Sequence, residues 1–223
     1  MTYGILLHHS PLYFSGGIPY NIRVRPNGQK EVLILKYCIT ERDRKKDLLE
    51  LLEENGVSLE LFPYDWLCTT DFFRAPASRG FHAAYPGGLY DHCRNVTNAL
   101  LYMQLVTAVW QRVESPIIVG MLHDVTKIGM YKLSQDMNPI SQEIETVYIK
   151  NPQFSTFGGH GYDSVCKIEQ HMELTEEERL CIRYHMGAYE KDDWDGYDRA
   201  IRKYPNVLWT HTADMFASKV MED

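Results

Sequence analysis

A histidine and an aspartate stand side by side at the end of an apolar segment. The stretch "SPIIVGMLHDVTKIG", residues 115–129, carries His123 and Asp124 immediately after its apolar residues. Burying a carboxylate without a partner is very costly, so Asp124 must be hydrogen-bonded, paired with a basic side chain or bound to a cation. The first question about this chain is therefore which partner Asp124 has.

Further side chains that can bind a metal ion are spread along the chain. The full set of six candidate ligands is His92, His123, Asp124, His160, His185 and Asp214. Apart from the adjacent pair, each lies in or at the start of a different predicted helix, and helix bundles hold metals with side chains from facing helices. Imidazole nitrogens and carboxylate oxygens together suit Mn, Fe, Co, Ni or Zn, and with more water Mg. We therefore predict that Asp124 binds a cation.

Five segments after residue 65 have the apolar spacing of helices, and they contain all six candidate ligands. These segments are residues 87–110, 115–131, 158–172, 174–189 and 204–221. Thr175, with Glu178 three residues later, forms a capping box that predicts the start of the fourth helix. We interpret the charged stretch "EKDDWDGYDR", residues 190–199, as a solvated loop beside the site. This part of the chain is expected to be almost entirely helical.

The N-terminal part has a different pattern. Two strand-like stretches flank "PNGQ", and Asn-Gly is the strongest short signal for a β-hairpin. Residues 40–56 predict a helix with Thr40 as its cap, Gly56 as its stop and an apolar face of Leu48, Leu49, Leu51 and Leu52. We expect a β-hairpin plus helix extension over residues 1–65 and a second domain over residues 66–223.

Composition narrows the classes of function. The chain has 223 residues, of which 44% are hydrophobic, and a formal net charge of −7. An acidic surface repels phosphate backbones, which argues against non-specific binding of long nucleic acid. The five cysteines lack CxxC spacing and predict reduced thiols, and no apolar run reaches the roughly 18 residues of a membrane span. We expect a cytoplasmic protein with no membrane contact.

The order H…HD…D, at His92, His123, Asp124 and Asp214, resembles the signature of the HD-domain superfamily of metal-dependent phosphohydrolases. The likeness extends to "PASRGFHAAYPGGLYDHCRNV", "MLHDVTKIG", "GGHGYDSV", "IRYHMGAY" and "LWTHTADMFASKV". These segments are similar to the HD domain of a bacterial 3′–5′ exoribonuclease family and of related plasmid and phage HD proteins. The resemblance covers roughly residues 72–220.

The resemblance implies a mainly α fold, an HD-domain helical bundle preceded by a small N-terminal β-hairpin segment. It implies that His92, His123, Asp124 and Asp214 hold one ion, that His160 and His185 bind a second, and that Asp124 bridges the two. The implied activity is that of a phosphohydrolase, a phosphomonoesterase or phosphodiesterase, in which a metal-activated water attacks phosphorus. The expected cofactor is two divalent ions of Mn, Fe, Co or Ni, with Mg or Zn as alternatives.

Three residues are candidates for contact with the substrate. Lys127 lies three residues after Asp124 and so on the same helical face, where it could bind a phosphate or protonate the leaving oxygen. An ordinary surface lysine is the alternative. His82 and Arg79 precede the first helix of the domain and could receive a phosphate at the mouth of the site, or belong to a solvated loop.

Departures from the family pattern favour a small substrate. Ala83 replaces the second histidine of the opening motif, and His185 stands where the family has "HH" before a glycine. The exoribonuclease family also resembles an OB-fold protein at its N-terminus, and the β segment here is too short for that five-stranded barrel. We expect a nucleotide or short oligonucleotide as substrate. A 3′–5′ exonuclease acting on single-stranded RNA or DNA and a non-catalytic, metal-bound sensor or binding module remain alternatives, and the oligomeric state is open.

Overall fold

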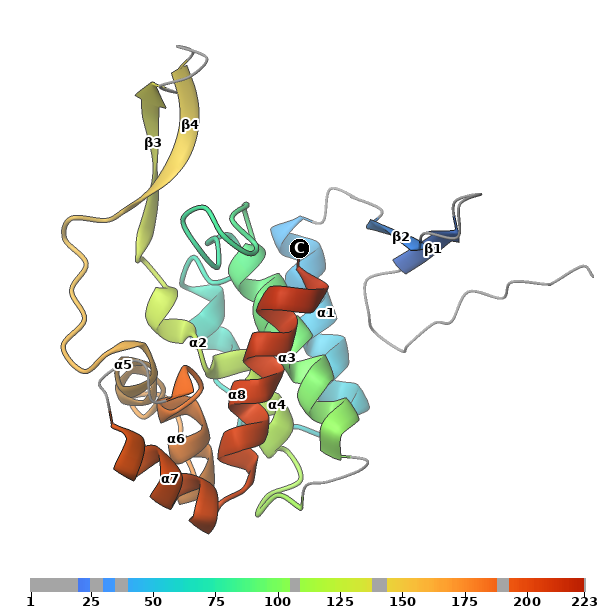
Figure 1. Ribbon diagram of the computed structural model, residues 1–223, viewed down its shortest axis with the longest axis vertical. Coiled ribbons are helices and arrows are strands. Elements are labelled where there is room, and N and C mark those ends of the chain that lie inside the picture. The colour runs from blue at the N-terminus through green and yellow to red at the C-terminus, as the bar shows by residue number, and fades with distance from the viewer. Residues whose placement is uncertain are drawn as a thin grey trace, which may run out of the picture. The chain divides into compact units, whose positions relative to one another are not determined.

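The computed structural model describes residues 20–24, 30–34, 40–104, 109–137, 144–187 and 193–222 (Figure 1). The chain divides into two compact units, Met1–Leu51 and Leu52–Asp223, and each is described by itself. The boundary expected from sequence, near residue 65, lies within the second unit. All six candidate metal ligands belong to the second unit as well.

The first unit contains the predicted hairpin. Strands β1 (Tyr20–Val24) and β2 (Lys30–Ile34) pair antiparallel, with Tyr20 opposite Ile34 and Val24 opposite Lys30. The Asn-Gly turn between them lies outside the described residues. The pairing itself confirms the two strands that the sequence predicts.

Helix α1 (Glu41–Glu54) is the predicted N-terminal helix. The Thr40 hydroxyl accepts a hydrogen bond from the Asp43 amide at 3.2 Å, and the Asp43 carboxylate accepts one from the Thr40 amide at 2.9 Å. This reciprocal bonding satisfies amides that a helix start leaves without intrahelical partners, so the predicted cap is confirmed. The chain turns after the helix at Gly56, whose φ is +68°. Leu49 is exposed, however, so it was wrongly assigned to the apolar face.

The second unit is mainly helical, as predicted (Figure 1). Its described α-helices are α2 (Tyr64–Cys68), α3 (Gly88–Gln104), α4 (Ser115–Leu122), α5 (His160–Ile168), α6 (Glu176–Arg183), α7 (Trp194–Lys203) and α8 (Asn206–Phe216). Helix α3 packs against α4 and α8, and α6 packs against α4, α5 and α8. The four helices that carry or adjoin five of the six candidate ligands, α3, α4, α6 and α8, therefore share one core.

Two sequence-based assignments in this unit are wrong. The helix predicted over residues 115–131 ends at Leu122, is followed by a 3₁₀ turn at Val125–Lys127, and leads into a hairpin of β3 (Tyr131–Met137) and β4 (Ile144–Lys150). The backbone leaves the helical conformation at Asp124, whose φ is −113°, and Gly129, with a φ of +74°, turns the chain into β3. Figure 1 shows this hairpin extending away from the helices of its unit. Apolar and polar residues alternate over residues 131–134 at the start of β3, a strand pattern that was not recognised in the sequence.

The other wrong assignment concerns the charged stretch interpreted as a loop. Its described part enters α7, because the Asp193 side chain accepts a hydrogen bond from the Gly196 amide at 3.0 Å and caps that helix. Tyr197 and Ala200 are buried and give the helix an apolar face. The many charged residues of this stretch led to its interpretation as a loop, although it forms an amphipathic helix.

Cysteine state and membrane contact were also predicted. Of the five cysteines, Cys68, Cys93, Cys166 and Cys181 lie in described segments and are free thiols, as expected. Cys38 lies outside the described residues. In the described segments, every helix is too short or too polar to cross a bilayer.

Helices α3 and α4 approach closely at Gly120. A Cβ added to Gly120 would lie 2.7 Å from the Thr97 Cα and 2.9 Å from the Thr97 amide nitrogen. Only glycine allows the two backbones to come this near, because no flexible side-chain end could move aside. The spacing matters for the site, since α3 carries His92 and α4 ends next to His123.

We expect Gly120→Ala to lower the free energy of unfolding by about 1–3 kcal/mol, the usual cost of overpacking a core. Urea denaturation of the metal-free protein measures it. Gly80→Ala is the matched control, because its added Cβ would meet nothing within 4 Å and should leave stability unchanged. Equal stability of the two variants would show that the helices can separate without cost.

Candidate metal centre

Five of the six predicted ligands come together in the core of the helical unit. His92 comes from the first turns of α3, His123 and Asp124 directly follow α4, His185 follows α6, and Asp214 lies in α8. Their exposed fractions are 1%, 0%, 2%, 0% and 8%, so all five side chains are buried. Residues separated by up to 122 positions thus share one site, which is what the predicted cation site requires.

The ligand atoms point at one another. The His92 Nε2 atom lies 3.1 Å from Asp214 Oδ1 and 3.3 Å from His123 Nε2. Asp124 Oδ2 lies 3.7 Å from each of these two imidazole nitrogens, and Asp124 Oδ1 lies 3.6 Å from His185 Nε2. Three imidazole nitrogens and two carboxylates therefore face a common centre.

These separations suit a shared cation. Two ligand atoms at about 2.1 Å from one ion lie about 3.0 Å apart in octahedral and about 3.4 Å apart in tetrahedral geometry. The observed separations of 3.1 to 3.7 Å fall within or slightly above this range, so small side-chain rotations suffice. Among the described residues, three overlapping groups have their ligand atoms within 4.8 Å of one another. Two consist of predicted ligands alone: His92, His123 and Asp214, and His123, Asp124 and His185. The third joins His92 to His82 and Glu222.

Backbone carbonyls hold two of the rings in the orientation that metal binding needs. His123 Nδ1 lies 2.8 Å from the Gly120 carbonyl, and His185 Nδ1 lies 2.7 Å from the Ile182 carbonyl. A carbonyl can only accept, so in each ring Nδ1 carries the proton and Nε2 keeps a lone pair directed inward. Burial lowers the pKa of His123 to about 4, which keeps this ring neutral and able to bind a cation.

Two buried atoms in the site have no hydrogen-bond partner among the described residues. They are Asp124 Oδ1 and His185 Nε2. Both present lone pairs, and they face each other across 3.6 Å. Leaving such groups unsatisfied in a core costs about 1–3 kcal/mol each. A cation between them would satisfy both, and this is the strongest sign that the donor set fits a metal ion.

Lys127 is one partner of Asp124. Its Nζ atom lies 2.6 Å from Asp124 Oδ2, and its side chain is only 12% exposed. Burial acts to raise the pKa of Asp124, but the positive charge of Lys127 and the neighbouring histidines hold it well below its usual range. The carboxylate is therefore ionised, with one oxygen paired to the lysine and the other directed at His185.

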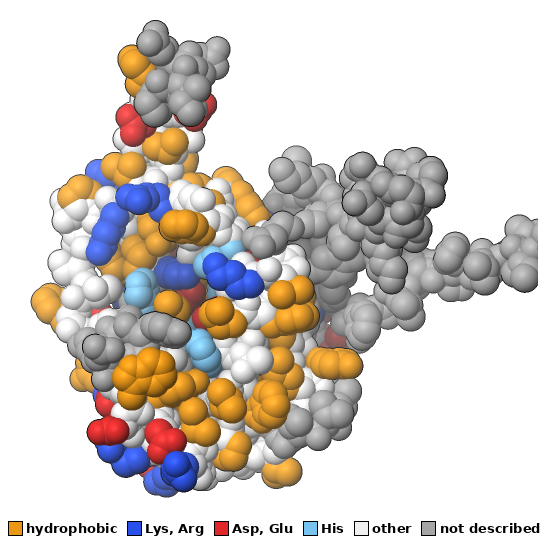
Figure 2. All heavy atoms as spheres, viewed as in Figure 1, with side chains coloured by type: hydrophobic (Ala, Val, Ile, Leu, Met, Phe, Trp, Pro, Cys, Tyr) orange, Lys and Arg blue, Asp and Glu red, His pale blue; other side chains and the backbone are white. Residues whose placement is uncertain are grey.

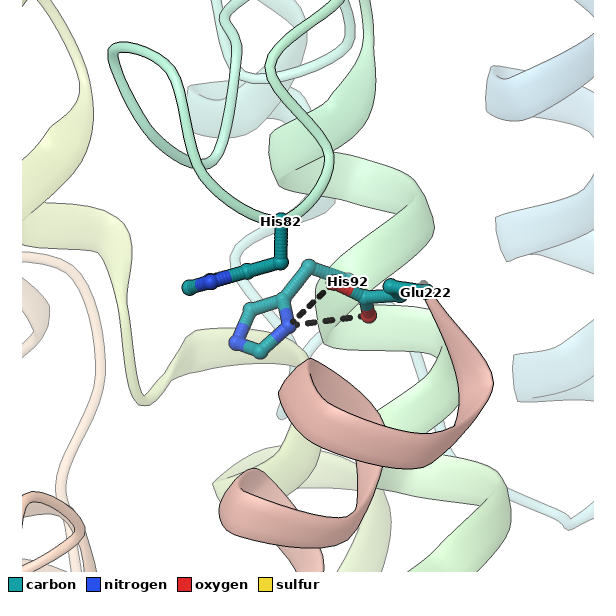
Figure 3. Close-up of side chains that lie close together, drawn as sticks. All are labelled: His82, His92 and Glu222. Carbon is teal, nitrogen blue, oxygen red and sulfur yellow. Dashed lines mark hydrogen bonds and ion pairs between the residues drawn. The ribbon is translucent and has the colours of Figure 1, made fainter.

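One residue of the site, Glu222, was not predicted from the sequence. Its Oε1 atom lies 3.0 Å from His92 Nδ1 (Figure 3). The same atom accepts a hydrogen bond from Asn95 Nδ2 at 3.1 Å. Burial alone would lower the pKa of His92, but the hydrogen bonds to Asp214 and Glu222 outweigh it and raise the pKa to about 10. No local pattern in the sequence marks Glu222, because eight residues of regular α-helix would place it about 80° away from the face of Asp214.

The other residues predicted from sequence are His82, Arg79 and His160. The His82 ring is half-buried, with its centroid 5.0 Å from that of His92, whereas Arg79 is exposed. Burial raises the pKa of Tyr131 while the charges of Lys127 and Arg79 act to lower it, so these three groups are electrostatic neighbours. On the face shown in Figure 2, histidine, basic and acidic side chains meet in one place.

His160 begins α5, outside the ligand groups found among the described residues, and its role as a ligand stays a prediction.

Metal binding should depend steeply on pH. The raised pKa of His92 means that both ring nitrogens are protonated at pH 8 in the metal-free protein. An ion can bind Nε2 only after that proton leaves, so Mn²⁺ should bind about tenfold more tightly for each unit of pH between about 7 and 9. A histidine with the ordinary pKa of about 6.5 would give nearly constant affinity over this range.

Calorimetric titration with Mn²⁺ at pH 8, in two buffers of different ionisation enthalpy, counts the protons released. We expect about one proton per protein from this ring. Binding without proton release would contradict the arrangement of His92 between two carboxylates.

Comparison with known proteins found no match among family models, curated proteins or solved structures. The chemistry of this centre therefore has to be inferred from its own donor atoms. Those atoms define a buried site of histidines and aspartates that could hold a metal ion.

Proposed function

We propose that the protein is a metal-dependent phosphohydrolase of the HD-domain type, which hydrolyses a phosphoester in a nucleotide or short oligonucleotide. The observation that supports this most is the convergence of three inward-facing imidazole nitrogens and two carboxylates on one buried centre. The order of these residues along the chain, H…HD…D, is the order that the resemblance implies.

The donor set favours a transition metal. His92, His123, His185, Asp124 and Asp214 would hold it, and this mixture of nitrogen and oxygen suits Mn, Fe, Co or Ni. Asp124 directs one oxygen at each of the two ligand groups, which supports two ions with this carboxylate between them. A bound divalent ion would acidify a water molecule and neutralise the charge that develops on the phosphoryl oxygens.

The chain's own basic groups would bind the substrate. Lys127 contacts Asp124, and a cation drawing on this carboxylate would free the ammonium to donate to a phosphate oxygen. Arg79 is exposed and acts electrostatically on the same tyrosine hydroxyl as Lys127, which supports a second cation on the substrate's side of the site. Half-buried His82, beside His92, would contact a further oxygen or the leaving group.

The charge of the protein favours a short substrate. Its net charge of −7 repels a long polyanion, whereas the few basic groups near the site can compensate for one or two phosphates. A nucleotide or short oligonucleotide satisfies both conditions.

A substrate panel tests the proposal. Purified protein with Mn²⁺ is given bis-p-nitrophenyl phosphate, a set of nucleotides and an end-labelled oligonucleotide, with Asp124→Asn as the inactive control. Turnover by the wild type that is absent from the variant supports the proposal. Stepwise shortening of the oligonucleotide from its 3′ end would identify an exonuclease instead. Full metal occupancy without turnover of any substrate would contradict hydrolysis and point to a sensor module.

A further inference from the structure

We infer that Glu222 is a positioning residue of the metal centre, which orients His92 and strengthens its bond to the ion. The inference rests on the proposed metal site but concerns a residue outside the expected ligand set. Figure 3 shows the Glu222 carboxylate directed at the edge of the His92 ring, with His82 next to the same ring.

The contacts of Glu222 fix it in place. Its two carboxylate oxygens lie 3.0 and 3.3 Å from His92 Nδ1, and Oε1 also accepts a hydrogen bond from Asn95 Nδ2 at 3.1 Å. The Glu222 side chain is only 4% exposed. His92 and Asn95 lie three residues apart in α3 and so on one helical face, where a single carboxylate can contact both.

The other nitrogen of the same ring faces Asp214. His92 Nε2 lies 3.1 Å from Asp214 Oδ1, so carboxylates eight residues apart contact the two nitrogens of one imidazole. In the other two rings of the site, a backbone carbonyl occupies the place that Glu222 takes at His92. A charged acceptor raises the basicity of the metal-binding nitrogen more than a neutral one does.

A local change of helix type brings Glu222 to this position. At 3.6 residues per turn, eight residues of α-helix would place Glu222 about 80° away from the face of Asp214. The chain instead forms a π-helical turn at Ala217–Met221, directly before Glu222. A π turn rotates less per residue and so brings Glu222 back toward that face. This turn also packs against α3, which carries His92.

The inference is tested by Mn²⁺ affinity and stoichiometry in Glu222→Ala and Glu222→Gln. Calorimetric titration should show about 10- to 100-fold weaker binding to Glu222→Ala, with the number of bound ions unchanged. Glu222→Gln keeps an oxygen that accepts from Nδ1 and should recover part of the loss. Glu173→Gln, which removes an exposed carboxylate elsewhere in the same unit, is the charge-matched control and should bind as the wild type does.

A spectroscopic measurement separates positioning from a general structural effect. In zinc-loaded protein, the His92 Nδ1 proton should give a slowly exchanging, strongly downfield NMR resonance, and Glu222→Ala should lose it while the corresponding resonances of His123 and His185 persist. Unchanged affinity in Glu222→Ala would overturn the inference. Loss of a whole ion would also overturn it, because Glu222 would then be a ligand. If the wild type binds no Mn²⁺, the proposed metal site fails as well.

Discussion

Asp124→Asn should weaken Mn²⁺ binding by more than about 100-fold and abolish hydrolysis. Substituting a residue that only hydrogen-bonds to a metal ligand already lowers metal affinity about 10- to 100-fold, and Asp124 would be a ligand itself. Asp124 is the carboxylate that faces both ligand groups, with Oδ2 directed at His92 and His123 and Oδ1 at His185. Asparagine keeps the size of the side chain but removes its charge and one acceptor oxygen. Calorimetric titration and the diester assay measure the two effects.

The same substitution leaves Lys127 buried without its counter-ion. Breaking one side of a buried ion pair costs about 3–5 kcal/mol, so the metal-free Asp124→Asn protein should also be less stable. Asp124→Asn combined with Lys127→Met removes both charges and should recover most of that stability. If the double variant is stable and still fails to bind Mn²⁺, the loss belongs to the site and not to unfolding. Binding at wild-type strength in either variant would remove Asp124 from the ligand set.

A second large effect on stability is expected at Glu178, which is not one of the candidate metal ligands. Its side chain is 0% exposed and accepts hydrogen bonds from Arg112 Nε at 3.0 Å, the Ser115 hydroxyl at 2.7 Å and the Thr175 amide at 2.9 Å. It thereby joins the start of α6 to the start of α4. Glu178→Ala would leave the guanidinium of Arg112, which is largely buried, and two further donors without this acceptor.

We expect Glu178→Ala to lower the free energy of unfolding by about 3–5 kcal/mol, the range found when a buried ion pair is broken. Urea denaturation in the presence of EDTA measures it without a contribution from bound metal. Glu176→Ala is the matched control from the same helical turn, because its side chain is 53% exposed and its loss should have little effect. Similar midpoints for the two variants would contradict the structural role of Glu178.

Capping residues and apolar spacing predicted most of the helices, but they did not predict contacts between residues far apart in the chain. Thr175 and Glu178 illustrate both results. Thr175 and Glu178 were predicted as a capping box, and the structure has both of its hydrogen bonds. The pairing of Glu178 with Arg112 was not predicted, because the two residues lie 66 positions apart and no local pattern connects them. Tertiary packing alone turns this helix cap into a buried ion pair.

The candidate site shows the same limit. The residue types and their order brought His92, His123, Asp124, His185 and Asp214 into one predicted cluster, and the structure brings these five together. Glu222 escaped prediction because its position depends on a π-helical turn, which has no clear signal in the sequence. The hairpin β3–β4 was not predicted, because only its first residue, Tyr131, fell within a predicted element, and that element was a helix.

The most direct test of the metal centre is a crystal structure of the protein with Mn²⁺, with an anomalous difference map that locates the metal. The map should show a peak about 2.0–2.3 Å from Nε2 of His92 and His123 and from carboxylate oxygens of Asp124 and Asp214. A second peak near His185 would establish the dinuclear arrangement. Absence of any peak among these residues at saturating Mn²⁺, or peaks only elsewhere on the protein, would contradict the account.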